Sequence, residues 1–492
     1  MRLDFDEALE KVGGFGFIQR YHFSVLMLAQ IAHAPSFISV AFVGKEPEFT
    51  CKGRAAGDPC KLDPPCTEFV YSTDFTSIVS EWDLVCDRKR EASYAQSLVM
   101  LGFLAGVIVL GRTSDMYGRL KTYVGGVICL VAVQLASGFS QNIYQYFFSR
   151  FLVGFFSGGG TLAGHILMLE SLVSRHRALL STIYHCGFAV GLAVLAAMAY
   201  YVRDWRQLTF VTCLPMVTII AIPLVIPESA RWLASNGRIE EAKEQLMYFG
   251  KKNGLRMNRS MIALTDKTVE AKGKSSSEGA MALFRTPVLR RRMITLMIIW
   301  FSCCLAYYGL TFGASSLGGN IYLNFALSGI VEVPAGLLSI FVLNCIGRRP
   351  TIAGSLFVVG FACLGVMALP RSEDGAMSTY QTCLALIGKM GVSVAFNSAY
   401  LYSSEILPTV LRNTAIGVCS MSARIGGILA PTLPPFGDKV AYFLFGVTTL
   451  FSALLNLTLP ESLNKQLPET VMDVENGMTT TVSHSEKRIG MS

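Results

Sequence analysis

The chain has 492 residues, of which 52% are hydrophobic and only 15% are charged, and its formal net charge is +8. Soluble globular domains carry about 25% charged residues, so this composition excludes an ordinary soluble protein and favours a chain exposed to lipid. The basic residues lie between apolar stretches, where they orient a membrane protein, so their excess does not point to a nucleic-acid partner.

Apolar stretches long enough to cross a membrane fill most of the chain. A span needs about 20 mostly apolar residues, and twelve stretches meet this condition. They are residues 17–43, 92–111, 121–139, 143–169, 178–201, 206–226, 293–313, 320–344, 351–370, 379–403, 413–436 and 440–459. The sequence therefore predicts an all-α membrane protein with twelve transmembrane helices, preceded by a short acidic segment, 1–16.

Two longer polar segments interrupt the spans. Residues 44–91 contain seven basic and ten acidic residues, whereas residues 227–292 contain 14 basic and seven acidic ones. By the positive-inside rule, the 227–292 linker, segment 1–16 and the tail 460–492 lie in the cytosol, and residues 44–91 lie outside. We expect a monomeric, multi-pass protein of the plasma membrane that contacts membrane lipid.

Four of the 13 cysteines fall in the external segment: Cys51, Cys60, Cys66 and Cys86. In an oxidising compartment such a cluster predicts two disulfides, and three connectivities are open. A zinc site is the alternative, but the segment has no CxxC pair and no histidine. We therefore expect no metal site and no cofactor.

Three short motifs recur in the same order, at an offset of about 229–235 residues. Gly118-Arg119 recurs as Gly347-Arg348, Glu170 with Arg177 as Glu405 with Arg412, and Pro227-Glu228-Ser229 as Pro460-Glu461-Ser462. The repeat predicts two pseudo-symmetric six-helix bundles, residues 17–226 and 293–459. This is the parallel arrangement of a major facilitator fold.

The stretch from Gly111 to Arg119 reads G-x-x-S-D-x-x-G-R and resembles the loop signature of the major facilitator superfamily. Glycines permit a tight turn, and Asp115 can pair with nearby arginines across helix ends in one conformation only. An ordinary solvated loop is the alternative. Ten further residues are gate candidates: Gly118, Arg119, Arg150, Glu170, Arg177, Glu228, Arg231, Arg348, Glu405 and Arg412.

Arg150 belongs to a second superfamily-like stretch, Arg150 to Gly154. The helix-end pairs Glu170 with Arg177 and Glu405 with Arg412 are expected to link neighbouring helices. Their alternative is charge pairing without a conformational role, which contributes little at a surface.

Several longer segments carry a resemblance to one family. They are Pro227 to Leu233, Tyr307 to Leu310, Val331 to Gly336, Ser404 to Pro408 and Ala423 to Pro431. Over nearly the whole chain the sequence resembles solute carrier family 22, and is most similar to its member 15 type, which is associated with zwitterions. The resemblance implies a transporter of small organic solutes that works by alternating access.

Three charged residues qualify as charges at mid-span: Glu332, Lys389 and Arg424. Each costs about 2.5–3.5 kcal/mol on insertion scales, so each is a functional candidate. In the family that the chain resembles, anion and carnitine carriers have arginine at the position of Arg424, and cation and carnitine carriers have an acidic residue at Glu332. The combination favours a carnitine-like betaine.

In this interpretation Arg424 holds the carboxylate, since its planar fork matches one. Glu332 and an aromatic face from Tyr307, Tyr308 or Phe396 hold the ammonium. Asn397 either lines the cavity or bonds to a neighbouring helix. Two alternatives remain open: Glu332 pairs with Arg424 instead, and Lys389 turns outward to the membrane surface.

Other functions have their own marks in the sequence. An organic anion transporter would use Arg424, an organic cation transporter would use Glu332, and a non-transporting sensor would have lost its gate charges. No phosphate-binding loop, metal cluster or nucleophile elbow supports an enzyme. The sequence leaves facilitated, sodium-coupled and exchange transport open.

Overall fold

The computed structural model describes residues 5–53, 59–61, 66, 68–256, 280–314, 319–370, 379–465 and 468–475. The chain forms two compact units, Met1–Lys274 and Ser275–Ser492, whose boundary falls inside the predicted 227–292 linker. Twelve helices in the described parts of the chain are long and apolar enough to cross a membrane. The prediction of an all-helical membrane protein is confirmed.

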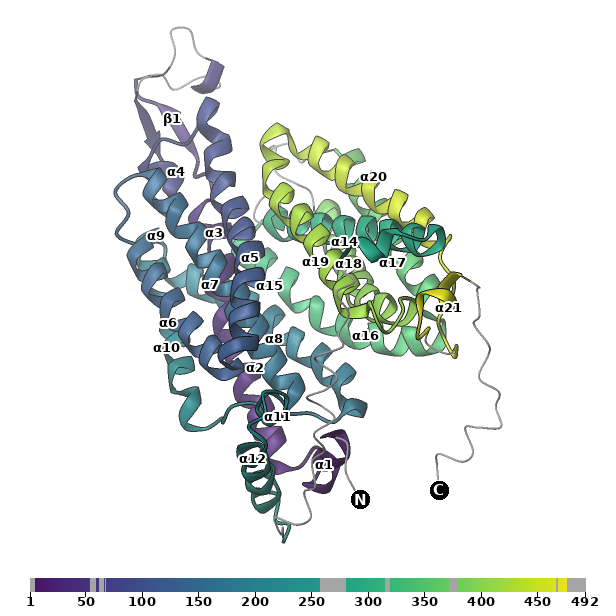
Figure 1. Ribbon diagram of the computed structural model, residues 1–492. Helices are drawn as coiled ribbons and strands as arrows, with labels where there is room; N and C mark the ends of the chain where they lie inside the picture. Colours follow the sequence, from purple (N-terminus) through teal and green to yellow (C-terminus); the bar gives the residue numbers. More distant parts are fainter. Residues whose placement is uncertain are drawn as a thin grey trace. The chain divides into compact units, whose positions relative to one another are not determined.

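The first unit contains six of these spans, which carry short helices at one end and a small sheet at the other (Figure 1). Spans two to five are single long helices, whereas spans one and six are each built from several pieces. In chain order the helices are α1 (Phe5–Lys11), α2 (Phe17–Ile38), α3 (Val40–Val43), α4 (Ile78–Glu81), α5 (Lys89–Tyr117), α6 (Arg119–Ser137), α7 (Ile143–Glu170), α8 (Ser174–Tyr201), α9 (Trp205–Val211), α10 (Leu214–Val217), η3 (Thr218–Leu224), α11 (Ala230–Ser235) and α12 (Ile239–Lys252).

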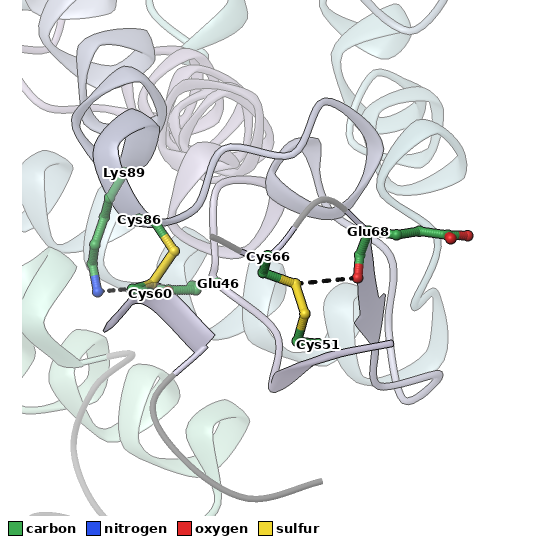
Figure 2. Close-up of a disulfide and its surroundings, with 7 residues drawn as sticks. All are labelled: Glu46, Cys51, Cys60, Cys66, Glu68, Cys86 and Lys89. Atoms are coloured by element: carbon green, nitrogen blue, oxygen red, sulfur yellow. Dashed lines mark hydrogen bonds and ion pairs between the residues drawn. A yellow bond between two sulfur atoms is a disulfide. The ribbon is translucent and has the colours of Figure 1, made fainter. Parts of the chain in front are cut away.

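The loop after α3 is a disulfide-linked element. Strands β1 (Phe49–Cys51) and β2 (Phe69–Tyr71) pair antiparallel, with Cys51 opposite Phe69. Disulfides join Cys51 to Cys66 and Cys60 to Cys86 (Figure 2). Cys60 lies in the turn η1 (Pro59–Lys61), and Cys86 starts the turn η2 (Cys86–Arg88), which leads directly into α5. The structure thus selects one of the three connectivities that the sequence left open.

Helices α5 and α7 pack with almost no space between their backbones. A Cβ atom built on Gly102 would lie 1.9 Å from the Phe151 carbonyl oxygen, and one on Gly154 would lie 1.9 Å from the Val99 carbonyl oxygen. No side chain fits at these distances. Small residues at helix contacts are typical of membrane proteins, where close van der Waals packing holds the helices together.

A separate apolar core lies beyond the spans of the first unit, at the end opposite β1 (Figure 1). There α1 buries Phe5 and Leu9 against Trp232 of α11 and Phe249 of α12. Asn253 fixes the following chain, because its side chain donates to the Val12 carbonyl and accepts from the Ile18 N–H. The first described residues are therefore packed in place.

The second unit repeats the six-span plan. Its elements are η5 (Ala280–Phe284), α14 (Pro287–Gly313), α15 (Ile321–Ile330), α16 (Glu332–Cys345), α17 (Arg348–Ala368), α18 (Thr379–Ile406), α19 (Arg412–Leu429), η7 (Ala430–Thr432), η8 (Pro434–Phe436), α20 (Asp438–Asn456) and α21 (Val471–Glu475).

The predicted span 320–344 is interrupted at Val331, between α15 and α16. Pro334 lies three residues later and has no N–H to donate to the Ile330 carbonyl, which weakens the helix at this point. Glu332 therefore lies in the first turn of α16.

Candidate functional site

Glu332 and Lys389 form a buried ion pair inside the second unit. The Lys389 Nζ lies 2.9 Å from Glu332 Oε1, and the two side chains are 1% and 11% exposed, respectively. Lys389 Nζ also donates to Thr311 Oγ1 at 2.5 Å and to the Tyr307 carbonyl at 3.4 Å. Lys389 is therefore held by one ion pair and two hydrogen bonds inside the unit.

Tyr307 contributes both its ring and its hydroxyl to this pair. Lys389 Nζ lies 3.2 Å from the centroid of the Tyr307 ring, within cation–π distance. The Tyr307 hydroxyl donates to Glu332 Oε2 at 2.9 Å. The Glu332 carboxylate of α16 and the Tyr307 ring of α14 thus already enclose an ammonium group, that of Lys389 on α18.

Arg424 of α19 belongs to the same cluster. Its guanidinium is half-buried and lies within electrostatic range of Tyr308, Cys304 and Tyr400. Glycines bring α19 close to α14 here, since a Cβ built on Gly427 would lie 3.3 Å from the Tyr308 ring. With Glu332, Lys389 and Arg424 together, the cluster has one more positive than negative charge.

The other two predicted site residues lie farther along α18. Phe396 packs against Trp300, with ring centroids 5.5 Å apart. Trp300 is about two helical turns before Tyr308 on α14, so Phe396 joins a different aromatic group from Tyr307. Asn397 is half-buried on α18.

One of the two alternatives for the charged residues disagrees with the structure. Lys389 does not turn outward, because its side chain is buried and contacts Glu332 and Thr311 inside the unit. The ion pair that the structure shows for Glu332 is with Lys389, and the alternative pair of Glu332 with Arg424 stays a prediction. The sequence identified Lys389 as a charge inside a predicted span. It could not identify Glu332 as the partner of Lys389, because the two residues lie on different helices.

The gate candidates of the first unit gather around Arg119, the first residue of α6. Its guanidinium lies 2.5 Å from Asp115 and 3.3 Å from Glu170 at the end of α7. The stretch expected as a loop is different in detail. Residues 111–117 are the last turns of α5, and Gly111 lies inside that helix. The turn at Gly118 leaves Arg119, at the start of α6, beside Asp115 in the last turn of α5.

Gly118 makes the turn between α5 and α6, with φ at 117°. Glu228 binds at this turn and accepts hydrogen bonds from the N–H groups of Arg119 and Leu120, at 2.9 and 3.0 Å. A Cβ on Gly118 would lie 2.3 Å from a Glu228 oxygen. Position 118 therefore requires glycine for two reasons: its φ is positive, and the Glu228 carboxylate leaves no room for a Cβ atom.

Arg177 and Arg231 meet at one carboxylate that sequence reasoning missed. Asp6 of α1 pairs with Arg177 at 2.8 Å and also with Arg231. Burial alone would raise the pKa of Asp6, but the Ser174 hydroxyl and the two guanidinium groups outweigh it and hold that pKa below its ordinary value. The Asp6–Arg231 contact spans 225 positions, so no local pattern reveals it.

The second unit repeats part of this arrangement. Arg348 pairs with Glu405 at 3.0 Å, and Glu461 accepts from the N–H groups of Arg348 and Arg349 at 3.0 Å each. Burial alone would raise the pKa of Glu461, but four backbone N–H groups hold it below its ordinary value. Glu461 matches Glu228 in the internal repeat, so the repeat could have identified Glu461 as a further gate candidate.

Arg412 is less closely matched to its counterpart Arg177. It donates to Thr409 at 3.1 Å, while Glu405 pairs with Arg348. In both units the helix-end glutamate therefore pairs with the arginine of the preceding motif. The expectation that Glu170 and Glu405 link neighbouring helices remains a proposal about gating.

Arg150 lies inside the first unit and is 1% exposed. It donates to Ser137 at 2.9 Å, to Ser39 at 3.3 Å and to Gln134, and its guanidinium lies over the Tyr146 ring. These contacts tie α7 to α6 and to the junction of α2 and α3. They place Arg150 away from the Arg119 cluster, about five turns along α7 from Glu170.

Comparison with known proteins agrees with this architecture. Residues 68–471 match the sugar (and other) transporter family. Solute carrier family 22 member 15 from Xenopus tropicalis is 36% identical over 96% of this chain and 91% of its own length. Organic anion transporter 3 from Homo sapiens is 31% identical over 96% and 94%, respectively.

A solved structure shows the same fold at low sequence identity. The inward-open xylose transporter XylE from E. coli aligns with a TM-score of 0.65 and 14% identity, over 93% of this chain and 99% of that one. The fold is that of the major facilitator superfamily, and the chain belongs to its solute carrier 22 family of organic ion transporters, which are not enzymes.

Proposed function

We propose that the protein carries small zwitterions, such as carnitine-like betaines, by alternating access across the plasma membrane, with both chain termini in the cytosol. The observation that carries this proposal is the enclosure of Lys389 Nζ by Glu332 and the Tyr307 ring. That enclosure already has the chemistry of an ammonium site. A substrate ammonium takes the place of Lys389 between the carboxylate and the ring.

Arg424 supplies the opposite charge for the substrate carboxylate. A guanidinium can donate two parallel hydrogen bonds to one carboxylate, and Arg424 lies near Tyr308, the neighbour of Tyr307 in sequence. A betaine that bridges the two places contacts Arg424 and Glu332 at the same time. Lys389, displaced from Glu332, keeps Thr311 and the Tyr307 carbonyl as acceptors.

The ion pairs at the helix ends connect substrate binding with the conformational change. The contacts of Arg119 with Asp115 and Glu170, and of Arg348 with Glu405, lie at helix ends. We propose that they hold one end of each bundle closed and separate when that end opens. Binding energy at the central site then shifts the balance between the two states.

An organic anion is the second candidate, and one observation favours it. Glu332 is already paired with Lys389, and Arg424 gives the cluster a net positive charge. In that case Glu332 is a structural partner and only Arg424 binds substrate. The two candidates differ in what Glu332→Gln should do.

Uptake by cells that express the chain tests both candidates. The cells receive one mixture of a betaine, a permanent cation and a monocarboxylate, and uptake is measured by mass spectrometry. The zwitterion proposal expects betaine uptake that Arg424→Ala abolishes and Glu332→Gln strongly reduces. Arg290→Ala, which changes an exposed arginine of α14, is the matched control.

Other outcomes have defined meanings. Monocarboxylate uptake that survives Glu332→Gln but not Arg424→Ala identifies an anion carrier. Cation uptake that survives Arg424→Ala moves the site to Glu332. A protein that reaches the surface and transports none of the three compounds contradicts the proposed substrate classes.

A further inference from the structure

A ring of polar contacts joins five helices at the α1 end of the first unit. Arg119 links α6 to Glu170 of α7. Arg177, in the first turn of α8, donates from Nε to the carbonyls of Leu169 and Leu172, at 3.2 and 3.0 Å. Its Nη2 donates to Asp6 of α1. The connection thus runs from α6 through α7 and α8 to α1.

The ring returns to α6 through α11. Asp6 also accepts from Arg231, the second residue of α11. Glu228 lies three positions before Arg231 and accepts from the N–H groups of Arg119 and Leu120. Asp6 is therefore the member that connects the α8 side of the ring with the α11 side.

Asp6 also offsets a repulsion. Arg177 and Arg231 are close enough that each charge acts on the other, and the Asp6 carboxylate contacts both. Without that carboxylate the two arginines repel each other across the α8–α11 contact. The depressed pKa of Asp6 agrees with this placement, because the surrounding cations favour its charged form.

Among the described residues of the second unit, the positions that match Arg177 and Arg231 do not share a carboxylate. The position that matches Arg231 is Asn464, and Arg412, which matches Arg177, donates to Thr409. The carboxylate–arginine part of the gate is common to both units, whereas the contact through α1 is confined to the first. A feature present in one repeat only is not explained by the shared fold.

We infer that α1 is part of the gate and that Asp6 is a positioning residue for transport, which closes this ring through Arg177 and Arg231. The inference rests on alternating access in the proposed function. The closed ring makes the helix ends of the first unit move as one body. Loss of Asp6 therefore slows the conformational cycle and leaves substrate binding, which lies elsewhere, unchanged.

Transport kinetics test the inference. Asp6→Asn should lower Vmax by about three- to tenfold, the scale of a lost charge-assisted contact, at unchanged KM and equal surface expression. Glu10→Gln makes the same charge change on the exposed face of α1 and should stay near wild type. Equal Vmax for both variants, or a loss through KM alone, overturns the inference.

Exchanging the charges separates positioning from folding. Asp6→Arg and Arg231→Asp should each be slow, and the double variant should recover a large part of Vmax, since an aspartate at position 231 can pair with Arg177 and with the new arginine. Asp6→Glu should recover more than Asp6→Asn. A double variant no faster than the slower single variant contradicts the ring.

Hydrogen–deuterium exchange gives a readout that needs no substrate. In purified full-length protein, Asp6→Asn should increase exchange in residues 171–177 and 228–235, and Glu10→Gln should not. Unchanged exchange in both segments overturns the inference. If the wild type transports none of the three test compounds, the proposed substrate classes fail, but this measurement still decides the role of Asp6.

Discussion

Lys389 Nζ lies 3.2 Å from the centroid of the Tyr307 ring, closer than it lies to the Tyr307 carbonyl oxygen. The ammonium is therefore held over the ring face, with Glu332 as its counter-charge. A cation over an aromatic face is attracted by the ring quadrupole, and the attraction is stronger where water is excluded. The same geometry suits a substrate ammonium.

Tyr307 should be tested with two substitutions that separate ring from hydroxyl. Tyr307→Phe keeps the ring and loses the hydrogen bond to Glu332, so betaine KM should rise only about two- to fivefold. Tyr307→Leu loses both, and KM should rise by about tenfold or more. Uptake kinetics measure the difference. Equal effects would show that the ring face does not bind substrate.

The Glu332–Lys389 pair should dominate the stability of the second unit's interior. Glu332→Gln leaves the Lys389 charge buried without its counter-charge, which should cost about 3–5 kcal/mol in the free energy of unfolding. Glu332→Gln with Lys389→Met removes both charges and should recover much of this loss. Thermal unfolding of the purified protein measures it.

The two single variants provide the check on that result. Lys389→Met should destabilise about as much as Glu332→Gln, because it leaves the carboxylate alone. If the double variant is as unstable as the sum of the single ones, the pair does not act as a unit. Independent additive losses would be the contradicting result.

Sequence periodicity was sufficient for the spans because lipid requires long apolar helices whose backbone groups are satisfied internally. It could not reveal where helices break or extend. Val331 interrupts an apolar stretch because of Pro334, and residues 111–117 continue α5 although their polar composition resembles a loop. The first difference lies inside the predicted span 320–344, and the second extends a helix beyond the predicted span 92–111.

The sequence was sufficient to propose three charged residues for the site, but not their pairings. Glu332, Lys389 and Arg424 were identified because charges inside spans are costly. Which of them pair depends on how α14, α16, α18 and α19 pack, and no pattern within one helix contains that information. Asp6 illustrates the same limit, since its partners lie on α8 and α11.

Gly118→Ala should destabilise the turn between α5 and α6. An alanine at φ 117° is strained, and its Cβ would lie 2.3 Å from a Glu228 oxygen, so the carboxylate must leave its two N–H partners. We expect a loss of about 2 kcal/mol or more. Gly125→Ala is the control on α6, because nothing lies within 4 Å of its added Cβ. Equal unfolding temperatures for the two variants would contradict the proposed role of Gly118.

The two disulfides should differ in what they hold. The Cys51–Cys66 bond closes a 15-residue interval and the Cys60–Cys86 bond a 26-residue interval. Loop-closure entropy gives about 3 and 3.5 kcal/mol, respectively. The second bond also ties the loop to the start of α5, next to the Lys89–Glu46 ion pair (Figure 2). Limited proteolysis should therefore cut the loop faster after Cys60→Ser with Cys86→Ser than after Cys51→Ser with Cys66→Ser. Equal cutting rates would count against the anchoring role.

Glu461 makes the stability of the second unit depend on pH. Its carboxylate accepts from four backbone N–H groups, so its pKa in the folded protein lies below the ordinary value of 4.5. The unfolded chain thus takes up the proton first as pH falls, and the stabilisation is fully present above about pH 4.5 and lost as pH falls through the folded pKa. Glu461→Gln should lower the unfolding temperature at pH 7 and reduce its decline between about pH 5 and pH 3. Glu469→Gln is the control, because Glu469 also follows α20 but is exposed. If the unfolding temperature of Glu461→Gln declines as steeply as that of the wild type, carboxylates other than Glu461 control acid unfolding.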